Sequence, residues 1–176
     1  CGVVWLIKLA VAGSPIAHSL SPLLHSTAYQ MLGVEAEFLA HEVSDQDFGN
    51  FYFESKNSQY RGLALTMPLK EICIGFIDRV DPIAKQISSV NTVIFESTGS
   101  IGISTDLLAF KNLLQPYFGK KIAILGAGGT ARAALGALKG TNTEVTVVTR
   151  SMVRHDQLHA AAADLDINFL DWHNFE

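Results

Sequence analysis

Cysteine, charge and long hydrophobic runs are all scarce in this sequence, and each shortage excludes a class of protein. The two cysteines, Cys1 and Cys73, are too few for a disulfide framework and match no zinc-binding spacing, so we expect no metal site. No apolar run is long enough to span a membrane, and no secretory signal pattern is present. A net charge of −4 without an extended basic run gives no reason to expect nucleic acid as a partner. Cytoplasm is therefore the expected location.

The sequence does contain enough apolar residues to form a packed core. Of its 176 residues, 48% are hydrophobic and 17% are charged, which suits one large domain or two small ones. The chain begins at Cys1 rather than at Met, so we expect a fragment or the ordered part of a longer chain.

Strand and helix patterns alternate along the whole chain, which predicts an α/β fold with parallel sheets. Before Gly119, apolar runs and turn signals predict strands at 6–12, 37–43, 62–67, 90–95 and 100–103, and helices at 22–32, 44–56, from 81 and from 105 to 115. After Gly119, the predicted strands are 121–125, 143–149 and 167–170, and the predicted helices are 130–139 and 152–163. We expect two domains, with their boundary in the helix between Asp106 and Gly119.

A glycine-rich turn joins the predicted strand 121–125 to the helix that follows it. Its residues fit the pattern G-x-G-x-x-A: Gly126, Ala127, Gly128, Gly129, Thr130 and Ala131. The first glycine permits a tight turn, the second lets the backbone approach a pyrophosphate, and the small alanine lets the helix pack closely on the strand. The N–H groups at the helix start can bind phosphate. The pattern predicts a Rossmann-type dinucleotide-binding domain over 107–176, incomplete because only three strands are present.

The end of the next predicted strand indicates which dinucleotide binds. Enzymes that use NAD carry an acidic residue there, which holds the ribose 2′-hydroxyl. Here the strand ends in Thr149, Arg150 and Ser151, with Arg154 one turn further, and no acid is present. Because a guanidinium can bind a 2′-phosphate through two hydrogen bonds, we predict NADP as the cofactor. The alternative is that both arginines are solvated charges at a helix start.

Polar groups follow the ends of several predicted elements in the first 106 residues. Ser19 and Ser21 precede a helix that Pro22 would begin, with Ser21 as its N-cap, and the two hydroxyls could hold a carboxylate. Taken singly, each such group has a plain structural interpretation as a cap, a turn residue or a surface charge. The other groups are Thr66, Lys70, Asn91 and Asp106.

Together and in this order, the motifs resemble those of the shikimate dehydrogenase family. They are GSPIAHSLSP at 13–22, TMPLK at 66–70, VNT at 90–92, STD at 104–106 and GAGGTA at 126–131, followed by Arg150 and Arg154. The resemblance covers nearly the whole chain. It implies an N-terminal α/β substrate-binding domain, 1–106, and the first half of an NADP-binding domain, 107–176.

The resemblance also implies an activity, the reversible reduction of 3-dehydroshikimate to shikimate by NADPH. By motif position, Ser19 and Ser21 match the residues that hold the substrate carboxylate. Thr66, Asn91 and Asp106 match residues that contact ring hydroxyls, and Lys70 with Asp106 matches the catalytic pair. The chemistry agrees, because a hydride that reaches a carbonyl carbon leaves an alkoxide, which a lysine can protonate. We expect a monomer or a homodimer.

Three positions depart from the family pattern and leave the substrate open. Ala64, Ser104 and Thr149 stand where relatives often have Asn. The closest alternative is a quinate or aminoshikimate dehydrogenase on the same scaffold, and a methylenetetrahydrofolate dehydrogenase is a more distant one. A truncated, non-catalytic module that binds substrate or nucleotide would belong to a different class.

Overall fold

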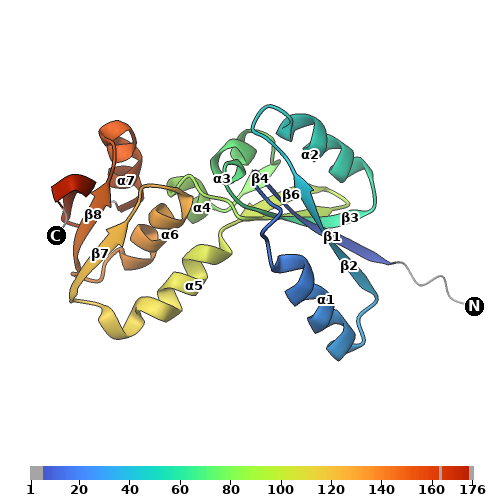
Figure 1. Cartoon of the computed structure of the whole chain (residues 1–176), viewed down its shortest axis with the longest axis horizontal. Coiled ribbons are helices and arrows are strands. Elements are labelled where there is room, and N and C mark those ends of the chain that lie inside the picture. Colours follow the sequence, from blue (N-terminus) through green and yellow to red (C-terminus); the bar gives the residue numbers. More distant parts are fainter. Residues whose placement is uncertain (1–5, 163, 175–176) are drawn as a thin grey trace, which may run out of the picture. The chain divides into compact units, whose positions relative to one another are not determined.

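The structure, a computed structural model, describes residues 6–162 and 164–174 (Figure 1). The chain divides into two compact units, which we describe separately. Unit 1 consists of Cys1–Val80 and Val90–Ile103, and unit 2 consists of Asp81–Ser89 and Ser104–Glu176. Each unit contains a β-sheet with helices packed on it, so the predicted α/β class is confirmed.

Unit 1 is built on a six-stranded sheet in the order β2-β1-β3-β5-β6-β4. Its strands are β1 (Ile7–Gly13), β2 (Ala36–Glu42), β3 (Tyr60–Leu65), β4 (Arg79–Val80), β5 (Thr92–Glu96) and β6 (Gly99–Ile103). Strand β1 pairs in parallel with β2 and β3, whereas β5 pairs antiparallel with β3 and β6. The expectation of parallel pairing is wrong for the β3–β5 and β5–β6 pairs, whereas β4 and β6 do pair in parallel. Strands β5 and β6 run antiparallel because a tight turn at Gly99 (φ 137°) connects them, with no helix between.

Helices cover both faces of this sheet, with α1 on one side and α2 on the other (Figure 1). The helices of unit 1 are α1 (Ser21–Leu32), α2 (Phe48–Asn57) and α3 (Leu69–Ile72), the last continued by a 3₁₀ turn at Cys73–Gly75. Helix α1 ends at Leu32, as predicted, and Gly33 follows it in the left-handed conformation, φ 64°. Helix α2 begins later than predicted because Ser44 and Asp47 hydrogen-bond to each other, which makes a turn before the helix.

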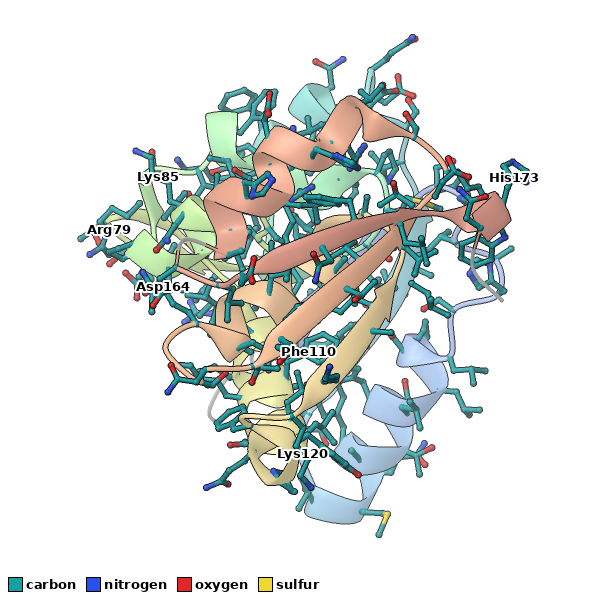
Figure 2. The ribbon with its side chains drawn as sticks, turned by 90° about the vertical axis from the view of Figure 1, so that its left-hand side faces the viewer. Arg79, Lys85, Phe110, Lys120, Asp164 and His173 are labelled. Carbon is teal, nitrogen blue, oxygen red and sulfur yellow. The ribbon has the colours of Figure 1, made fainter. Side chains whose placement is uncertain are left out.

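Unit 2 contains a three-stranded sheet in which all pairs are parallel, in the order β7-β8-β9. Its elements are α4 (Pro82–Gln86), α5 (Thr105–Leu114), β7 (Lys121–Leu125), α6 (Gly129–Leu138), β8 (Glu144–Thr149), α7 (His155–Ala162) and β9 (Ile167–Asp171), with 3₁₀ turns at Gln115–Tyr117, Met152–Arg154 and Trp172–Asn174. Figure 2 looks onto these strands, with Lys120 and Asp164 towards their starts and His173 beyond the end of β9.

Helix α6 forms the centre of the unit 2 core. Every residue from 131 to 138 is buried, and the side chains of Leu135 and Leu138 pack with apolar residues of β8 and α7. Arg132 lies in this core with 1% of its surface exposed. Its guanidinium donates to the carbonyl oxygens of Ile87 (2.9 Å) and Ser88 (2.8 Å). These bonds compensate the buried charge and hold the segment 81–89 against α6.

Candidate functional site

The carboxyl ends of β1 and β3 meet at one edge of the unit 1 sheet because the two strands are parallel neighbours. The Thr66 N–H donates to Ala12 O at 3.0 Å, and the Ser14 N–H donates to Met67 O at 2.8 Å. A Cβ on Gly13 would overlap the Thr66 side chain and lie 2.8 Å from Met67 O. Only glycine therefore fits between these two strand ends.

The start of β5 reaches the same edge, since β5 runs antiparallel to β3. The Leu65 N–H donates to Asn91 O at 2.8 Å, and the Val90 N–H donates to Lys70 O at 2.8 Å. Main-chain hydrogen bonds thus connect the segments that carry Thr66, Lys70 and Asn91, all three of which are half-buried. Motifs separated in the sequence converge here, as the functional hypothesis requires.

Ser19 and Ser21 lie at the end of the loop that leaves this edge after β1, and both are half-buried. The predicted N-cap role of Ser21 is wrong, because α1 begins at Ser21 and the N-cap position is Leu20. Instead, the Ser19 Oγ accepts a hydrogen bond from the Ser21 N–H at 3.3 Å. The Ser19 hydroxyl is therefore oriented by the first turn of the helix.

Glu42 is an organising residue that sequence reasoning missed. Its carboxylate accepts hydrogen bonds from the Ser14 Oγ (2.5 Å) and from the Ile16 N–H (2.8 Å), which shape the loop leading to Ser19. These bonds, that of Ser14 first, lower the pKa of the Glu42 carboxyl. Glu42 stands opposite Gly13 in the β1–β2 register, which no local pattern reveals. We call the following residues the unit 1 edge: Ser14, Ser19, Ser21, Glu42, Thr66, Lys70 and Asn91.

Asp106, the proposed partner of Lys70, belongs to unit 2 and is half-buried in the first turn of α5. Helix α5 starts at Thr105, as predicted, and its N-cap position is Ser104. The Ser104 side chain makes no capping hydrogen bond, and its buried hydroxyl has no hydrogen-bond partner within the described part of the chain. The backbone at Ser104 is extended, and α5 starts at the next residue, Thr105, one residue before Asp106.

A cavity of about 470 Å³ opens at the carboxyl ends of β7 and β8 in unit 2. The turn after β7 forms one wall, and the Gly126 N–H donates to Val148 O at 2.9 Å, which ties this turn to β8. We call this space the unit 2 cavity; its lining residues are Leu125, Gly126, Ala127, Gly128, Val148, Thr149, Arg150, Ser151, Val153, Arg154 and Trp172.

Two glycines in the wall of this cavity have different reasons for being glycine. Gly126 has φ 113°, which L side chains rarely adopt, so the turn itself requires it. Gly128 has φ −81°, and a Cβ there would meet no heavy atom within 4 Å. Nothing in the described part of the chain therefore demands glycine at position 128. The N-cap position of α6 is Gly128, which has no side chain, so the helix N-terminus also fits a phosphate ligand.

The opposite wall is the end of β8 and the turn that follows it. Thr149 is buried, and its Oγ1 donates to Ser151 O at 3.0 Å, while the Ser151 Oγ accepts from the Val153 N–H at 3.2 Å. These bonds shape the turn that carries Arg150 and Arg154, both of which are exposed. Thr130 and Ala131, the last two residues of the predicted motif, lie in α6, exposed and buried respectively.

A second cavity, of about 570 Å³, lies at the amino ends of β1 and β3 in unit 1. It is lined by Lys56, Tyr60, Arg61 and Phe95 among others, and by none of the predicted site residues. It is larger than the unit 2 cavity, but it lies at the end of β3 away from Thr66, and its lining carries no predicted motif. We therefore attach the function to the unit 1 edge and the unit 2 cavity.

Metal clusters and membrane spans are both missing from the residues that the structure describes. Residues 6–162 and 164–174 contain no group of three or more His, Cys, Asp and Glu side chains that could hold a metal ion. Over the same ranges, no helix combines the length and apolar character needed to cross a membrane. Cys73 is buried, and burial raises the pKa of its thiol to about 12, so the thiol stays protonated.

The sequence is similar to known proteins over most of its length. Residues 11–93 match the family model described as the shikimate dehydrogenase substrate binding domain. The chain is 35% identical over 164 residues to the shikimate dehydrogenase (NADP(+)) of Bacillus cereus strain G9842, covering 90% of this chain and 59% of the relative. It is 38% identical over 164 residues to the corresponding protein of Methanosarcina acetivorans, covering 88% of this chain and 58% of the relative.

Solved structures agree with this relationship. The crystal structure of shikimate 5-dehydrogenase from Thermus thermophilus in complex with NADP(H) and shikimate superimposes with a TM-score of 0.80 and 32% identity. The match covers 94% of this chain and 63% of that one. This chain therefore spans less than two thirds of the length of each of these relatives.

Proposed function

Because this chain is related to the shikimate dehydrogenases through residues of both its units, we propose that the protein catalyses the reversible, NADP-dependent reduction of 3-dehydroshikimate to shikimate. The observation that carries the proposal is the convergence of Thr66, Lys70 and Asn91 on one edge of unit 1. These residues come from separate motifs, and main-chain hydrogen bonds hold their segments together. Such a preformed polar edge suits a small ligand rich in hydroxyl groups.

NADP is assigned to the unit 2 cavity. The open space above Gly128 and the start of α6, whose N-cap is this glycine, fit the pyrophosphate. Arg150 and Arg154, exposed at the end of β8, fit the 2′-phosphate, and this strand end carries no acid that would repel it. When bound, the reduced cofactor supplies a hydride, and the remaining chemistry belongs to the protein's own side chains.

Substrate binding is assigned to hydroxyl, amide and carboxylate groups. The Ser19 and Ser21 hydroxyls would donate to the substrate carboxylate, and Ser19 is already oriented by the helix start. Thr66, Asn91 and Asp106 would bond the ring hydroxyls. Glu42 would keep the serine loop in shape, since it accepts hydrogen bonds from two groups of that loop. The donors and acceptors together match a carboxylate with several neighbouring hydroxyls.

Proton transfer is assigned to Lys70 with Asp106. Reduction of the ketone places a negative charge on the former carbonyl oxygen. The Lys70 ammonium donates a proton to this oxygen, which yields the alcohol and a neutral amine, and solvent then restores the ammonium. In the reverse direction the neutral amine accepts the hydroxyl proton. In this proposal the Asp106 carboxylate would orient the amine and accept a hydrogen bond from the substrate hydroxyl.

The domain roles follow from the same proposal. Residues 1–106 would form the substrate-binding domain and residues 107–176 the first half of the NADP-binding domain. The family match over 11–93 supports the first of these assignments. We also propose a cytoplasmic location, which accords with the sequence's low cysteine content, and a monomer or homodimer.

The test is to assay the purified protein against a panel of substrates and cofactors, with the absorbance of NADPH or NADH as the readout. Shikimate with NADP should give the highest kcat/KM, above quinate, aminoshikimate and any substrate with NAD. Arg150→Ala should raise the KM for NADP about tenfold or more, since hydrogen bonds to charged groups are worth about 1.5–3 kcal/mol. Arg61→Ala, another exposed arginine, is the control. Equal KM values for NAD and NADP in the unmodified protein would contradict the cofactor assignment.

A higher kcat/KM with quinate or aminoshikimate would change the assigned substrate and leave the assignment as a dehydrogenase of this fold intact. Binding of shikimate and NADP without any turnover would identify a binding module. Failure to bind either ligand would overturn the proposal.

A further inference from the structure

Trp172 is a surface tryptophan whose position in unit 2 has no explanation in core packing. It opens the 3₁₀ turn after β9, and 39% of its surface is exposed. Among the described residues, the hydrophobic core of unit 2 and the apolar side chains packed against it do not include Trp172. The residue instead contributes to the wall of the unit 2 cavity.

Sheet register explains why Trp172 reaches this cavity. Strands β8 and β9 are parallel, and their last paired residues are Thr149 and Asp171. Arg150 and Trp172 are the next residues of the two strands, so they leave neighbouring strand ends together. Figure 2 shows the end of β9 at the edge of the sheet, with the labelled His173 directly after Trp172 in the chain.

The two side chains are in contact. The Arg150 guanidinium carbon lies 5.2 Å from the centre of the Trp172 ring, within the range of a cation–π interaction. The turn that carries the ring is held in place, because the Asp171 carboxylate accepts a hydrogen bond from the His173 N–H at 2.8 Å. An exposed arginine would otherwise sample many rotamers, and the ring restricts it to those beside the cavity.

We infer that Trp172 is a positioning residue that determines cofactor specificity by holding Arg150 ready for the adenosine 2′-phosphate. The inference builds on the proposed function, since it takes NADP as the ligand of the unit 2 cavity. A guanidinium already oriented by a ring loses less conformational freedom when it forms its hydrogen bonds to a phosphate. The benefit applies only to ligands that carry the 2′-phosphate, so Trp172 adds discrimination and not general affinity.

Binding of two nucleotides measured by calorimetry tests this inference without any turnover. Adenosine 2′,5′-bisphosphate carries the 2′-phosphate, and adenosine 5′-phosphate lacks it. Trp172→Ala should weaken binding of the bisphosphate about two- to fivefold, the size of an exposed cation–π contact, and leave binding of the monophosphate unchanged. Trp172→Phe should restore most of the lost affinity. A general structural defect would weaken the binding of both nucleotides.

Two controls separate the contact from its surroundings. Tyr117→Ala removes another exposed cation–π pair of unit 2, in which the Lys120 Nζ lies 5.6 Å from the ring centre, and should affect neither ligand. In an Arg150→Ala background, Trp172→Ala should have no further effect, because the two residues act through one contact.

The outcomes distinguish this inference from the function on which it builds. Three results would overturn the role of Trp172 and leave the proposed function standing. Trp172→Ala could weaken the binding of both nucleotides equally, it could leave the affinity for the bisphosphate unchanged, or it could have its full effect in the Arg150→Ala background. If the unmodified protein binds the two nucleotides equally, the NADP assignment fails and the inference fails with it.

Discussion

The unit 1 edge and the unit 2 cavity both lie at strand ends. Neighbouring protein atoms pack tightly around Gly13 at the unit 1 edge, whereas the space beside Gly128 in the unit 2 cavity is open. At the unit 1 edge, main-chain hydrogen bonds connect the loops after β1 and β3, and no side chain fits at Gly13. In the unit 2 cavity, a Cβ on Gly128 would meet no heavy atom within 4 Å. The same residue type thus satisfies internal packing in one place and leaves room for a ligand in the other.

This difference matches the two ligands proposed. A small polyhydroxylated acid is recognised by side chains in a fixed arrangement, so the edge that holds them must be rigid before binding. A dinucleotide is recognised largely through backbone groups and charges around an open space, so the protein must leave that space empty. Substitutions at the unit 1 edge and in the unit 2 cavity test this difference.

The largest expected effect is on turnover. Lys70→Ala should lower kcat about 10²- to 10⁴-fold, the usual contribution of a positioned acid or base. The affinity for NADP should stay unchanged, because Lys70 belongs to unit 1 and the cavity to unit 2. Lys111→Ala, at an exposed position of α5, is the control. Steady-state kinetics and a nucleotide titration measure both quantities, and turnover within a few-fold of the unmodified protein would remove Lys70 from the mechanism.

A smaller effect, on stability, is expected at the unit 1 edge. Gly13→Ala should lower the free energy of unfolding by about 1–3 kcal/mol, since the new methyl group would overlap Thr66. Gly75→Ala lies in the same unit, and its Cβ would meet nothing within 4 Å, so it should be neutral or slightly stabilising. Urea denaturation of both variants measures the difference. If the two variants were equally stable, the edge would be looser than its hydrogen bonds indicate.

The matching substitution in the unit 2 cavity should affect binding and spare stability. Gly128→Ala should weaken NADP binding about tenfold, about 1.4 kcal/mol, by obstructing the approach of the pyrophosphate. Its unfolding midpoint should not change, because the position has an ordinary φ and open space around it. Gly126→Ala provides the contrast, since φ 113° should make it destabilising. Unimpaired NADP binding by Gly128→Ala would place the cofactor elsewhere.

The smallest expected effect is the acid sensitivity of unit 1. Hydrogen bonds from Lys56 and then Ser100 lower the pKa of the Asp78 carboxyl to about 2. Because this value lies below the unfolded value of about 3.9, the carboxylate stabilises the fold above that pH, and the contribution is lost as the pH falls towards 2. Asp78→Asn should therefore flatten the decline of thermal stability in this window, whereas Glu54→Gln should leave it unchanged. An identical decline in both variants would show that Asp78 plays no part.

Local patterns in the sequence predicted the unit 2 site more completely than the unit 1 site. The predicted strand 121–125 agrees with β7, and the predicted glycine turn forms the cavity wall. These features depend on residues that are close in the chain. The prediction failed where competing local bonds decide helix starts, as at Ser21 and at Ser44 with Asp47. The roles of individual residues at both sites stay predictions that the kinetic and binding measurements will test.

The sequence alone was enough to predict most strands and helices, the glycine turn and the set of chemical groups, because turns and strand periodicity depend on neighbouring residues. Which distant groups come together depends on how the strands pair in the folded protein. Glu42 reaches Ser14 because Glu42 pairs with Gly13 in the β1–β2 register, and Trp172 reaches Arg150 through the corresponding register of β8 and β9. Register depends on both strands of a pair, so the pattern along one strand does not by itself identify which residue lies opposite.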